Sequence, residues 1–529
     1  MTEKWGRSIA TIMESHANSA PHQPVVVGTH RHWNYIQLLA TQEEFVRHLR
    51  EISQPGDSVA VVSDDYLMTM VALSASVAAS RTVAFVSPLL PSRVQLRQIQ
   101  RLNPTAVIAK QGLIDGLNRV QPGFTFEVVS RTGGELEQYR TAMSHPKADA
   151  SPNGRGKGDA KSLVVLFTSG TTGEPKMVVH DEHSLINAFL LIRAVACEVL
   201  APALQQTLAE ALVGPIGSEW FTVTRDSAIS LRYLNCMPPT SIAGIGMALQ
   251  AMLGGDSMSL TPSYDPADAI AMIGRLAITN LGVTPSFAQA LVRAGRRIDG
   301  STASLETIGV GGGIVPPRLC GNLEERFKCR VIAGYGATEL GGVVASSRYL
   351  DDETIRWTTI GRAVPGVELR ISATSELEVR SPAVGLGYLS EKGDVASFCD
   401  DEGWYLTGDK AVESENRSFK ISGRIADTIM RSGAKIDPWD IEDLILSHSE
   451  VSEAAVVGIP SRISGEHDIV AFVVASSTVT PSLLRRLCLR ELGPQFTPRK
   501  IAIVAELPST NEGKIDRNAI RNAFINVAG

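Results

Sequence analysis

The segment from Thr168 to Lys176, with the sequence TSGTTGEPK, places hydroxyl groups, glycines and one lysine directly after an apolar run. The preceding residues 161–166 (KSLVVL) predict a short strand, so the segment would offer backbone N–H groups, hydroxyls and an ammonium to a polyphosphate. Glycine allows the backbone to approach such an anion closely. Lys176 follows a proline and precedes Met177, which departs from the Gly-x4-Gly-Lys-Ser/Thr pattern of P-loop nucleotidases. The segment therefore predicts a different phosphate-binding loop, and a plain Ser/Thr/Gly turn is the alternative.

Further segments carry side chains that suit a nucleotide. Residues 334–339 (GYGATE) follow a predicted strand and offer an aromatic face, a hydroxyl and a carboxylate to a nucleotide and its Mg²⁺. Asp409 closes the segment 404–409 (WYLTGD), where its carboxylate suits the two hydroxyls of a ribose. Arg424 offers a guanidinium to a phosphate or ribose, and Lys514 lies on a glycine-supported tip. Taken singly, residues 334–339 are more simply a turn, residues 404–409 a strand end and Lys514 a solvated lysine.

Composition limits the classes of protein to which the chain can belong. The 529 residues are 44% hydrophobic and 20% charged, which is typical of a globular protein with several domain-sized units. A net charge of -6 disfavours sequence-independent binding of nucleic acid. We expect no secretory signal, because the N-terminus has no long apolar core followed by a small-residue cleavage site. We expect no membrane span, because no stretch of about eighteen uninterrupted apolar residues occurs. The scattered cysteines predict free thiols in a reducing compartment, and hence a cytoplasmic protein.

Hydrophobic patterns predict the elements that hold these segments. Short apolar runs alternate with helical stretches: strands at 24–27, 58–63, 83–86, 106–108, 126–129, 281–283 and 308–310, and helices at 67–79, 183–200 and 242–253. This β-α-β rhythm predicts an α/β fold, with a mostly parallel, layered body. Residues 145–161 lack large apolar side chains and predict a surface linker. Alternating residues from 368 to 406 predict a small antiparallel sheet or barrel that closes the body.

Beyond Arg424 the pattern changes to a compact α+β arrangement. It predicts a helix at 439–446, strands at 451–458 and 469–474, and a helix at 481–492. We therefore expect an N-terminal domain of residues 1–422 and a lid-like C-terminal domain of residues 423–529.

Taken in order, the segments resemble those of the adenylate-forming superfamily of acyl-CoA synthetases, adenylation domains and luciferases, and the resemblance spans nearly the whole chain. The matching motifs are the loop at 168–176, Gly-Gly-Gly at 311–313, Tyr-Gly-x-Thr-Glu at 335–339, Thr-Gly-Asp at 407–409, Gly-Arg at 423–424 and Gly-Lys-Ile at 513–515. The resemblance, not the periodicity, implies a large N-terminal domain and a small C-terminal domain that rotates.

The resemblance implies a ligase that uses ATP, Mg²⁺ and coenzyme A in two steps. A carboxylate attacks the α-phosphate of ATP to give an acyl-adenylate and pyrophosphate, and a thiol then displaces AMP. Attack of one anion on another needs positive charge where the pentacovalent phosphate forms, so Lys514 would bridge the carboxylate and the phosphate. Thr338 would contact the α-phosphate and Glu339 would bind Mg²⁺.

The resemblance also assigns the remaining site residues. Nucleotide contacts are implied for Thr168, Ser169, Gly170, Thr171, Thr172, Gly173, Lys176, Gly311, Gly312, Tyr335, Gly336, Ala337, Asp409 and Arg424. Among these, Tyr335 would pack on adenine, Asp409 would hold the ribose and Arg424 would lie at the ribose-phosphate edge. Substrate contacts are implied for Ser241, Gly244 and Gly313, a thiol channel for Ser432, Gly433 and Ala434, and a hinge for Ala426.

Three positions depart from the family pattern. Ala426 stands where members usually carry an aspartate at the pivot, and alanine cannot make polar contacts that change as the domains swing. Ser241 replaces a histidine or aromatic residue that often lies beside the reacting carboxylate, and Met430 replaces a common lysine. Either these changes are harmless, or the first half-reaction is weak and the enzyme mainly thiolates a supplied acyl-adenylate.

The substrate is predicted from the expected pocket lining. Residues 236–249 and 311–315 are rich in small and aliphatic side chains and contain no acidic partner for a substrate amine. Such a lining leaves volume, so we expect a bulky, mostly apolar carboxylic acid, such as a polycyclic acid or an intermediate of secondary metabolism. Core packing alone would select similar residues.

Other functions share the motifs. An adenylation enzyme that loads a carrier protein would carry all of them, and a luciferase-like oxygenase would emit light with a luciferin and oxygen. A non-catalytic scaffold would require that nucleotide binding fails, against the presence of Lys176, Glu339, Asp409, Arg424 and Lys514.

Overall fold

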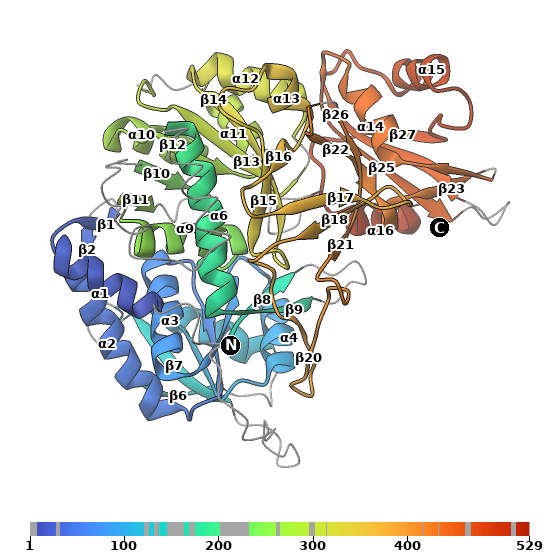
Figure 1. Ribbon diagram of the computed structural model, residues 1–529. Coiled ribbons are helices and arrows are strands. Elements are labelled where there is room, and N and C mark those ends of the chain that lie inside the picture. Colours follow the sequence, from blue (N-terminus) through green and yellow to red (C-terminus); the bar gives the residue numbers. More distant parts are fainter. Residues whose placement is uncertain are drawn as a thin grey trace.

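The computed structural model describes residues 8–27, 32–120, 126–131, 136, 138–144, 163–168, 175–200, 232–255, 257–260, 265–295, 302–313, 315–414, 416–431, 433–460, 467–508 and 515–527. Two nine-stranded sheets form the body of the N-terminal part. A four-stranded sheet adjoins them, and a smaller α+β unit follows toward the C-terminus (Figure 1).

The first large sheet carries parallel strands at its centre and antiparallel strands at both edges. Its order is β16-β15-β14-β13-β12-β10-β11-β1-β2, and the pairings from β1 through β14 are parallel. The strands are β16 (Arg362–Ala363), β15 (Gly342–Ser346), β14 (Arg330–Ala337), β13 (Thr307–Gly311), β12 (Asn280–Val283), β10 (Arg232–Asn235), β11 (Ser257–Leu260), β1 (Pro24–Val27) and β2 (His32–Asn34).

The second large sheet is built in the same way, with the order β20-β19-β9-β8-β4-β3-β5-β7-β6. Only the central pairings β8-β4, β4-β3 and β3-β5 are parallel. The strands are β20 (Val395–Ala396), β19 (Gly387–Leu389), β9 (Lys176–Asp181), β8 (Leu163–Thr168), β4 (Thr82–Val86), β3 (Ser58–Val62), β5 (Ala106–Lys110), β7 (Tyr139–Ser144) and β6 (Phe126–Arg131). Both sheets are therefore mixed, because hairpins at their edges add antiparallel strands to the expected parallel body.

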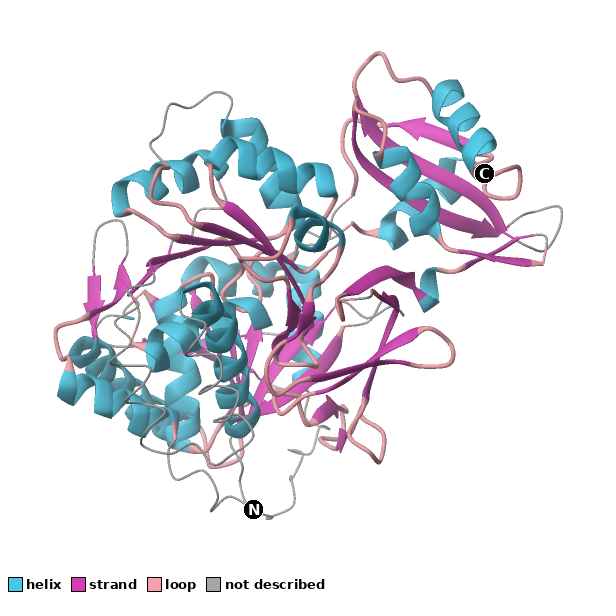
Figure 2. Cartoon of the chain, turned by 45° about the horizontal axis from the view of Figure 1, so that its top comes forward, coloured by secondary structure: helices cyan, strands magenta, loops and turns pink. Residues whose placement is uncertain are grey.

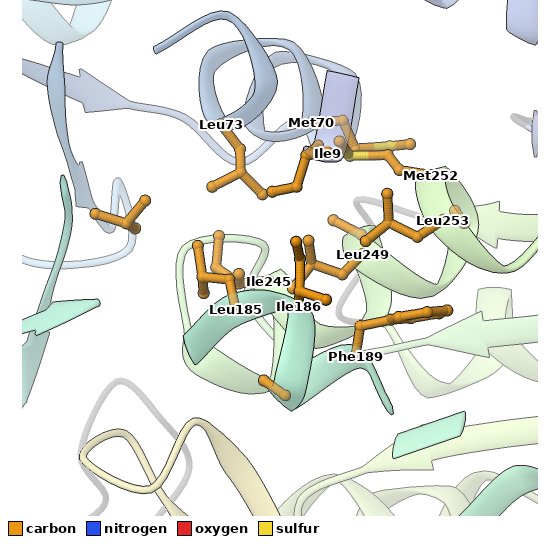
Figure 3. Close-up of a cluster of buried hydrophobic side chains, with 14 of the residues drawn as sticks. Ile9, Met70, Leu73, Leu185, Ile186, Phe189, Ile245, Leu249, Met252 and Leu253 are labelled. Atoms are coloured by element: carbon orange, nitrogen blue, oxygen red, sulfur yellow. The ribbon is translucent and has the colours of Figure 1, made fainter. Parts of the chain in front are cut away.

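Helices fill the space between the two sheets and cover their outer faces. The central layer contains α1 (Ile9–Ser19), α2 (Tyr35–Ile52), α3 (Tyr66–Ala79), α6 (Glu182–Leu200) and α9 (Ile242–Gly254), whose side chains share one core with strands of both sheets. Figure 3 shows part of this core, where Phe189 and Ile186 from α6 face Leu249 and Ile245 from α9. The outer layers are α10 (Pro266–Leu276), α11 (Pro285–Gly295) and α12 (Pro317–Phe327) on the first sheet, and α4 (Ser92–Leu102) and α5 (Gln111–Val120) on the second.

The four-stranded sheet confirms the antiparallel unit expected after residue 368. Its order is β17-β18-β21-β22, with β17 (Glu368–Ile371), β18 (Glu376–Arg380), β21 (Tyr405–Glu413) and β22 (Phe419–Arg424), and every pairing is antiparallel. A short helix, α13 (Glu353–Thr358), precedes it. Because Leu377, Val379 and Phe419 join the central core, this sheet is fixed to the large body.

The C-terminal unit stands apart from the body in Figure 2 and has its own cores. After a single turn of 3-10 helix, η3 (Ile425–Asp427), come β23 (Ile429–Arg431), β24 (Ala434–Ile436), α14 (Pro438–Leu446), β25 (Val451–Pro460), β26 (His467–Ala475), α15 (Pro481–Glu491), β27 (Lys500–Ile503) and α16 (Arg517–Val527). The expected helices and strands of this unit are confirmed within a few residues.

Most local predictions are confirmed, because the apolar runs are strong. The run at 67–79 lies in α3, whose residues are buried on nearly every side between α2 and the second sheet. The predicted strand at 329–333 continues to Ala337, and Tyr335 and Gly336 therefore lie in β14 opposite β15 instead of in a turn. The carboxylate of Asp409 likewise lies within β21 and not at a strand end. The predicted linker 145–161 lies outside the described residues.

The cysteines that the structure describes carry free thiols, as expected. Cys236, Cys320, Cys329 and Cys488 are free and buried, and Cys399 is free and half-buried. No described helix combines the length and the apolar character needed to cross a bilayer.

Candidate functional site

The predicted phosphate loop connects two paired strands. Strand β8 ends at Thr168 and β9 begins at Lys176, and these two residues face each other in the antiparallel ladder. Ser169, Gly170, Thr171, Thr172 and Gly173 lie outside the described residues. Lys176 is exposed, and its Nζ lies 4.6 Å from the ring centroid of Tyr388. The hairpin therefore presents the ammonium of Lys176 beside an aromatic ring that belongs to a neighbouring strand.

Asp409 contacts two of the other predicted nucleotide residues. The register of β21 and β22 sets Asp409 opposite Arg424, and Arg424 Nε donates to Asp409 Oδ1 at 2.7 Å. The hydroxyl of Tyr335, from the first large sheet, donates to Asp409 Oδ2 at 2.6 Å. The side chain of Asp409 is 12% exposed. Two sheets thus contribute an aromatic ring, a guanidinium and a carboxylate to one point.

The charges in this cluster stabilise one another. Burial and the adjacent Asp409 carboxylate raise the pKa of Tyr335 well above its usual value, so the phenol stays protonated and donates. Burial alone would lower the pKa of Arg424, but the attraction of Asp409 and the hydrogen bond to it, together with Tyr335 and Asp427 nearby, raise the pKa. Since each oxygen of Asp409 keeps a free lone-pair direction beyond these bonds, the carboxylate can still accept from a ligand hydroxyl.

Thr338 and Glu339 follow the end of β14 and are held by groups from the second sheet. The backbone N–H of Gly385 donates to the Glu339 carbonyl at 2.8 Å. The hydroxyl of Tyr388 donates to Glu339 Oε1 at 2.8 Å. His180 Nε2 donates to the Thr338 carbonyl at 2.7 Å. The turn that carries the predicted phosphate and metal contacts is thus fixed to β9 and to the β19 segment.

His180 is fully buried, which defines its protonation. Burial lowers the pKa of His180, and the Thr338 carbonyl can only accept, so the neutral ring carries its proton on Nε2. Its other nitrogen, Nδ1, lies 3.1 Å from the hydroxyl oxygen of Ser184. His180 therefore acts as a fixed donor to the turn and not as a titrating base at neutral pH.

The predicted Gly-Gly-Gly motif, residues 311–313, begins at the end of β13. Gly311 faces Gly334 across β13 and β14, and a Cβ on Gly311 would lie 3.2 Å from the Gly334 carbonyl oxygen. Gly312 has a φ of +83°, which L side chains rarely adopt. Gly313 lies near the ring of Pro285. The end of β13 therefore carries no side chains at the place where adenine is expected to pack on the ring of Tyr335.

Ser241 and Gly244 start helix α9. Ser241 Oγ donates to the Pro238 carbonyl at 2.7 Å and accepts from the Gly244 N–H at 3.1 Å, which makes it the N-cap. A Cβ on Gly244 would overlap the backbone of Pro238, so only glycine fits. The structure thus gives Ser241 a capping bond that a histidine at this position would not make in the same way.

The C-terminal side of the site is described only in part. Lys514 and Ser432 lie outside the described residues. Gly433 has a φ of +74°, and a Cβ there would meet open space. Ala434 begins β24, and Ala426 is exposed in the 3-10 turn. Gly433 therefore lies in the turn between β23 and β24, and Ala426 lies two residues beyond Arg424 of the Asp409 cluster.

Sequence reasoning missed His180 and Tyr388. A single histidine inside a strand and a single tyrosine between apolar residues carry no motif. Both become visible only because β19 pairs with β9, with Tyr388 opposite Val178. The four motifs that lie wholly within the described residues are 311–313, 335–339, 407–409 and 423–424. Strand pairing sets Gly311 beside Gly334, and both Tyr335 and Arg424 donate to Asp409, so these motifs come together.

Among the described residues, no group of three or more His, Cys, Asp or Glu side chains could hold a metal ion alone. A single carboxylate, that of Glu339, is instead oriented by Tyr388 and follows Thr338, whose carbonyl is bound by His180 of β9. Mg²⁺ commonly binds through one or two carboxylates together with substrate phosphates. The donor set therefore fits a metal ion that arrives with a nucleotide.

Comparison with known proteins agrees with the geometry. Residues 13–394 match the model of the family described as AMP-binding enzyme, and residues 440–514 match that of the AMP-binding enzyme C-terminal domain. The chain is 24% identical over 532 aligned residues to the probable CoA ligase CCL5 of Humulus lupulus, covering 96% of this chain and 91% of that protein.

Two further similarities extend this result. The 3-[(3aS,4S,7aS)-7a-methyl-1,5-dioxo-octahydro-1H-inden-4-yl]propanoyl:CoA ligase of Rhodococcus jostii is 27% identical over 489 residues, covering 88% of this chain and 89% of that protein. The crystal structure of ATP-bound MatB from Rhodopseudomonas palustris superposes with a TM-score of 0.78 and 21% identity, covering 99% of this chain and all of that one. The latter similarity establishes the fold.

Proposed function

The chain belongs to the AMP-binding enzyme family, and from this premise we propose that it is an acyl-CoA ligase that activates a bulky, mostly apolar carboxylic acid through an acyl-adenylate. The observation that carries the proposal is the convergence of Tyr335 and Arg424 on Asp409. A flat aromatic ring beside a buried carboxylate with spare acceptor capacity suits an adenosine. The CoA ligases among its relatives support a thiol as the second substrate.

In the first step the substrate carboxylate attacks the α-phosphorus of ATP, the new C–O–P anhydride forms, and pyrophosphate leaves. Lys514 would neutralise the two approaching anions, and the Thr338 hydroxyl would donate to the α-phosphate. The loop 168–176 would hold the leaving pyrophosphate with its backbone N–H groups and Lys176. Tyr335, Gly311 and Gly312 would form the adenine platform.

Mg²⁺, when bound, would neutralise charge on the phosphates of ATP. Glu339 is the protein ligand that the donor set supports, because its carboxylate is nearly buried, oriented by Tyr388 and adjacent to the hairpin of Lys176. Asp409 is engaged by Arg424 and Tyr335 and would serve the ribose instead.

In the second step the thiolate of coenzyme A attacks the acyl carbon, the thioester forms and AMP leaves. We propose that the C-terminal domain, residues 423–529, turns about Ala426 between the steps, so that Lys514 gives way to a thiol channel at Ser432, Gly433 and Ala434. Gly433 supports this, since its missing side chain leaves room for a pantetheine arm beside the backbone.

The hydrogen bonds around Ala426 support a pivot of two residues. On one side, Arg424 is paired with Asp409 of the body. On the other, Asp427 accepts from Arg521 at 3.0 Å within the C-terminal unit. Ile425 and Ala426 lie between these anchors, and both are exposed. Torsion changes confined to these residues would rotate one unit against the other without breaking either pair.

Contacts that cross the pivot define the observed pose. Lys410 Nζ donates to Thr428 Oγ1 at 2.8 Å and to Asp437 Oδ2 at 3.2 Å. Arg293 of α11 pairs with Glu453 of β25 at 3.3 Å. These are half-buried or exposed pairs, each worth on the order of 1 kcal/mol or less, so rotation would meet only a modest barrier from them.

The small side chains at the start of α9 support a large acyl pocket, and Gly313 would line it. The relative named for a ring-fused propanoyl substrate supports a polycyclic acid.

The free cysteines support a reducing compartment, and we propose a cytoplasmic enzyme.

The test is to scan a panel of acids, from acetate to polycyclic propanoates, by pyrophosphate release with ATP and, separately, by CoA-thioester formation from supplied acyl-adenylates. We expect both assays to respond to bulky apolar acids. Asp409→Ala should raise the KM for ATP at least tenfold, whereas Asp394→Ala, at an exposed site, should not change it.

The outcomes separate the alternatives. Silence in the first assay with success in the second would refute the two-step proposal in favour of an enzyme that thiolates a supplied adenylate. Acylation of a phosphopantetheinylated carrier protein in preference to coenzyme A would identify a loading enzyme.

A further inference from the structure

Tyr388 connects two groups that the proposed function uses separately. Its hydroxyl donates to Glu339 Oε1 at 2.8 Å, and its ring face lies 4.6 Å from Lys176 Nζ. One tyrosine thus touches both the candidate metal ligand and the candidate phosphate ligand. No sequence motif of the site contains it.

The position of this ring is fixed by its surroundings. Strand β19 adds to the edge of the second large sheet and sets Tyr388 opposite Val178, two residues beyond Lys176. Phe398 packs against Tyr388 with ring centroids 5.0 Å apart, and against Tyr405 at 5.2 Å. Such aromatic contacts limit rotation of the ring.

The hydroxyl of Tyr388 is the donor in its bond to Glu339, because a carboxylate oxygen accepts. The bond engages one oxygen of the carboxylate and fixes the direction of the other. A hydrogen bond to a charged acceptor contributes more than one between neutral groups.

The contact with Lys176 places its ammonium over the electron-rich ring face. The exposed lysine would otherwise sample many rotamers, and the ring favours those that keep the ammonium over its face. The carboxylate of Glu339 at the hydroxyl and the ammonium of Lys176 over the ring face are thus both positioned relative to one ring.

We propose that Tyr388 is a positioning residue that orients Glu339 and Lys176 together for a metal-bound nucleoside triphosphate. This inference rests on the proposed function and deepens it. It requires that Tyr388 matters for binding a metal–triphosphate complex but not for binding AMP, which lacks the β- and γ-phosphates and uses the Asp409 side of the site.

The test measures binding and not turnover. Mn²⁺ serves as the probe, titrated with a non-hydrolysable ATP analogue and followed by electron paramagnetic resonance, and AMP binding is measured by calorimetry without metal. Tyr388→Phe keeps the ring and its packing but removes the hydroxyl. We expect the Kd of the Mn²⁺–triphosphate complex to rise about tenfold, while the Kd of AMP changes less than about twofold.

Tyr139→Phe is the matched control, because it also removes a buried hydroxyl, here one that lies 2.6 Å from Ser63 Oγ. It should leave both Kd values unchanged. A second variant, Glu339→Asp, keeps the carboxylate but withdraws it from Tyr388. On that background Tyr388→Phe should add no further loss.

The results distinguish a failure of the proposed function from a failure of the positioning role of Tyr388. If the unmodified protein binds neither AMP nor the Mn²⁺–triphosphate complex, the proposed function fails. If it binds both and Tyr388→Phe binds both equally well, or loses both to the same degree, the positioning role of Tyr388 is refuted. A full additional loss on the Glu339→Asp background would also refute it.

Discussion

Arg517 should decide the stability of the C-terminal domain, because it neutralises a buried carboxylate. Glu442 of α14 is 3% exposed, and Arg517 Nη1 and Nη2 donate to its two oxygens at 2.6 and 2.9 Å. Arg517 Nη1 also donates to the Val456 carbonyl at 2.7 Å. Arg517 lies three positions after Lys514, so the same residue fastens the segment that carries the proposed catalytic ammonium.

The perturbation is Arg517→Met, which keeps much of the volume but removes the charge. Among the described residues, it leaves the Val456 N–H as the remaining hydrogen-bond donor to the buried Glu442. Breaking one side of a buried ion pair typically costs about 3–5 kcal/mol. Arg521→Ala is the control. Arg517 and Arg521 both pair with Asp427, at 3.5 and 3.0 Å, and loss of the more exposed Arg521 should cost about 1 kcal/mol or less.

The loss should depend on pH. Burial raises the pKa of Glu442, and Arg517 opposes that shift, so removal of Arg517 raises the pKa further. A carboxyl group whose pKa is higher in the folded than in the unfolded state destabilises the fold above its folded pKa and not below its unfolded value. The cost of Arg517→Met should therefore be full near pH 8 and shrink toward pH 5.

Native-state hydrogen exchange can measure this cost segment by segment. Amides of β25 and β26 should exchange at least about a hundredfold faster in Arg517→Met at pH 8, while those of β12 and β13 in the body stay unchanged. Adding Glu442→Gln should restore most of the protection, since the amide carries no charge. Unchanged exchange in the single variant, or a loss that grows toward pH 5, would refute the reasoning.

Three further predictions concern the reaction and the fold. Lys514→Ala should abolish pyrophosphate release from acid and ATP but retain thioester formation from a supplied acyl-adenylate, and equal loss in both assays would contradict its assignment to the first step. Ala426→Asp should change the ratio of the two half-reaction rates severalfold without changing AMP affinity, as stopped-flow and calorimetric measurements would show; an unchanged ratio argues against a pivot there. Burial lowers the pKa of His180 below 6.5, so the unfolded chain takes up a proton in acid that the native chain does not; melting temperatures should fall below pH 6.5, and less steeply in His180→Gln.

The local elements were predictable because their patterns are short-range. The apolar run that forms α3 and the strands of the C-terminal unit need no distant partner to be recognised. The antiparallel sheet after residue 368 was likewise visible as alternation. The mixed character of the two large sheets was not, because edge strands such as β7 and β19 join through pairings that span long stretches of chain.

In the candidate site, too, the residues in local motifs were predictable and the contacts between them were not. Asp409, Arg424 and Tyr335 were identified from motifs, and the structure adds that they contact one another. Their actual positions inside strands, instead of at turns, follow from the ladders β14-β15 and β21-β22. Ser241 was considered as a substrate contact from its place in a motif, but its bonds to Pro238 and Gly244 are local to the start of α9.

By itself, the sequence determined the family, the order of the motifs and the kind of chemistry, because glycines, hydroxyls and charged groups at fixed spacings are chemical properties of the chain. Only the tertiary structure decided which of these groups share a site and what holds them. His180 and Tyr388 acquire their roles from β9 and β19, which the fold brings to the turn at Glu339 across a large separation in sequence. A hydrogen bond depends on distance and direction in space, and no spacing along the chain encodes either.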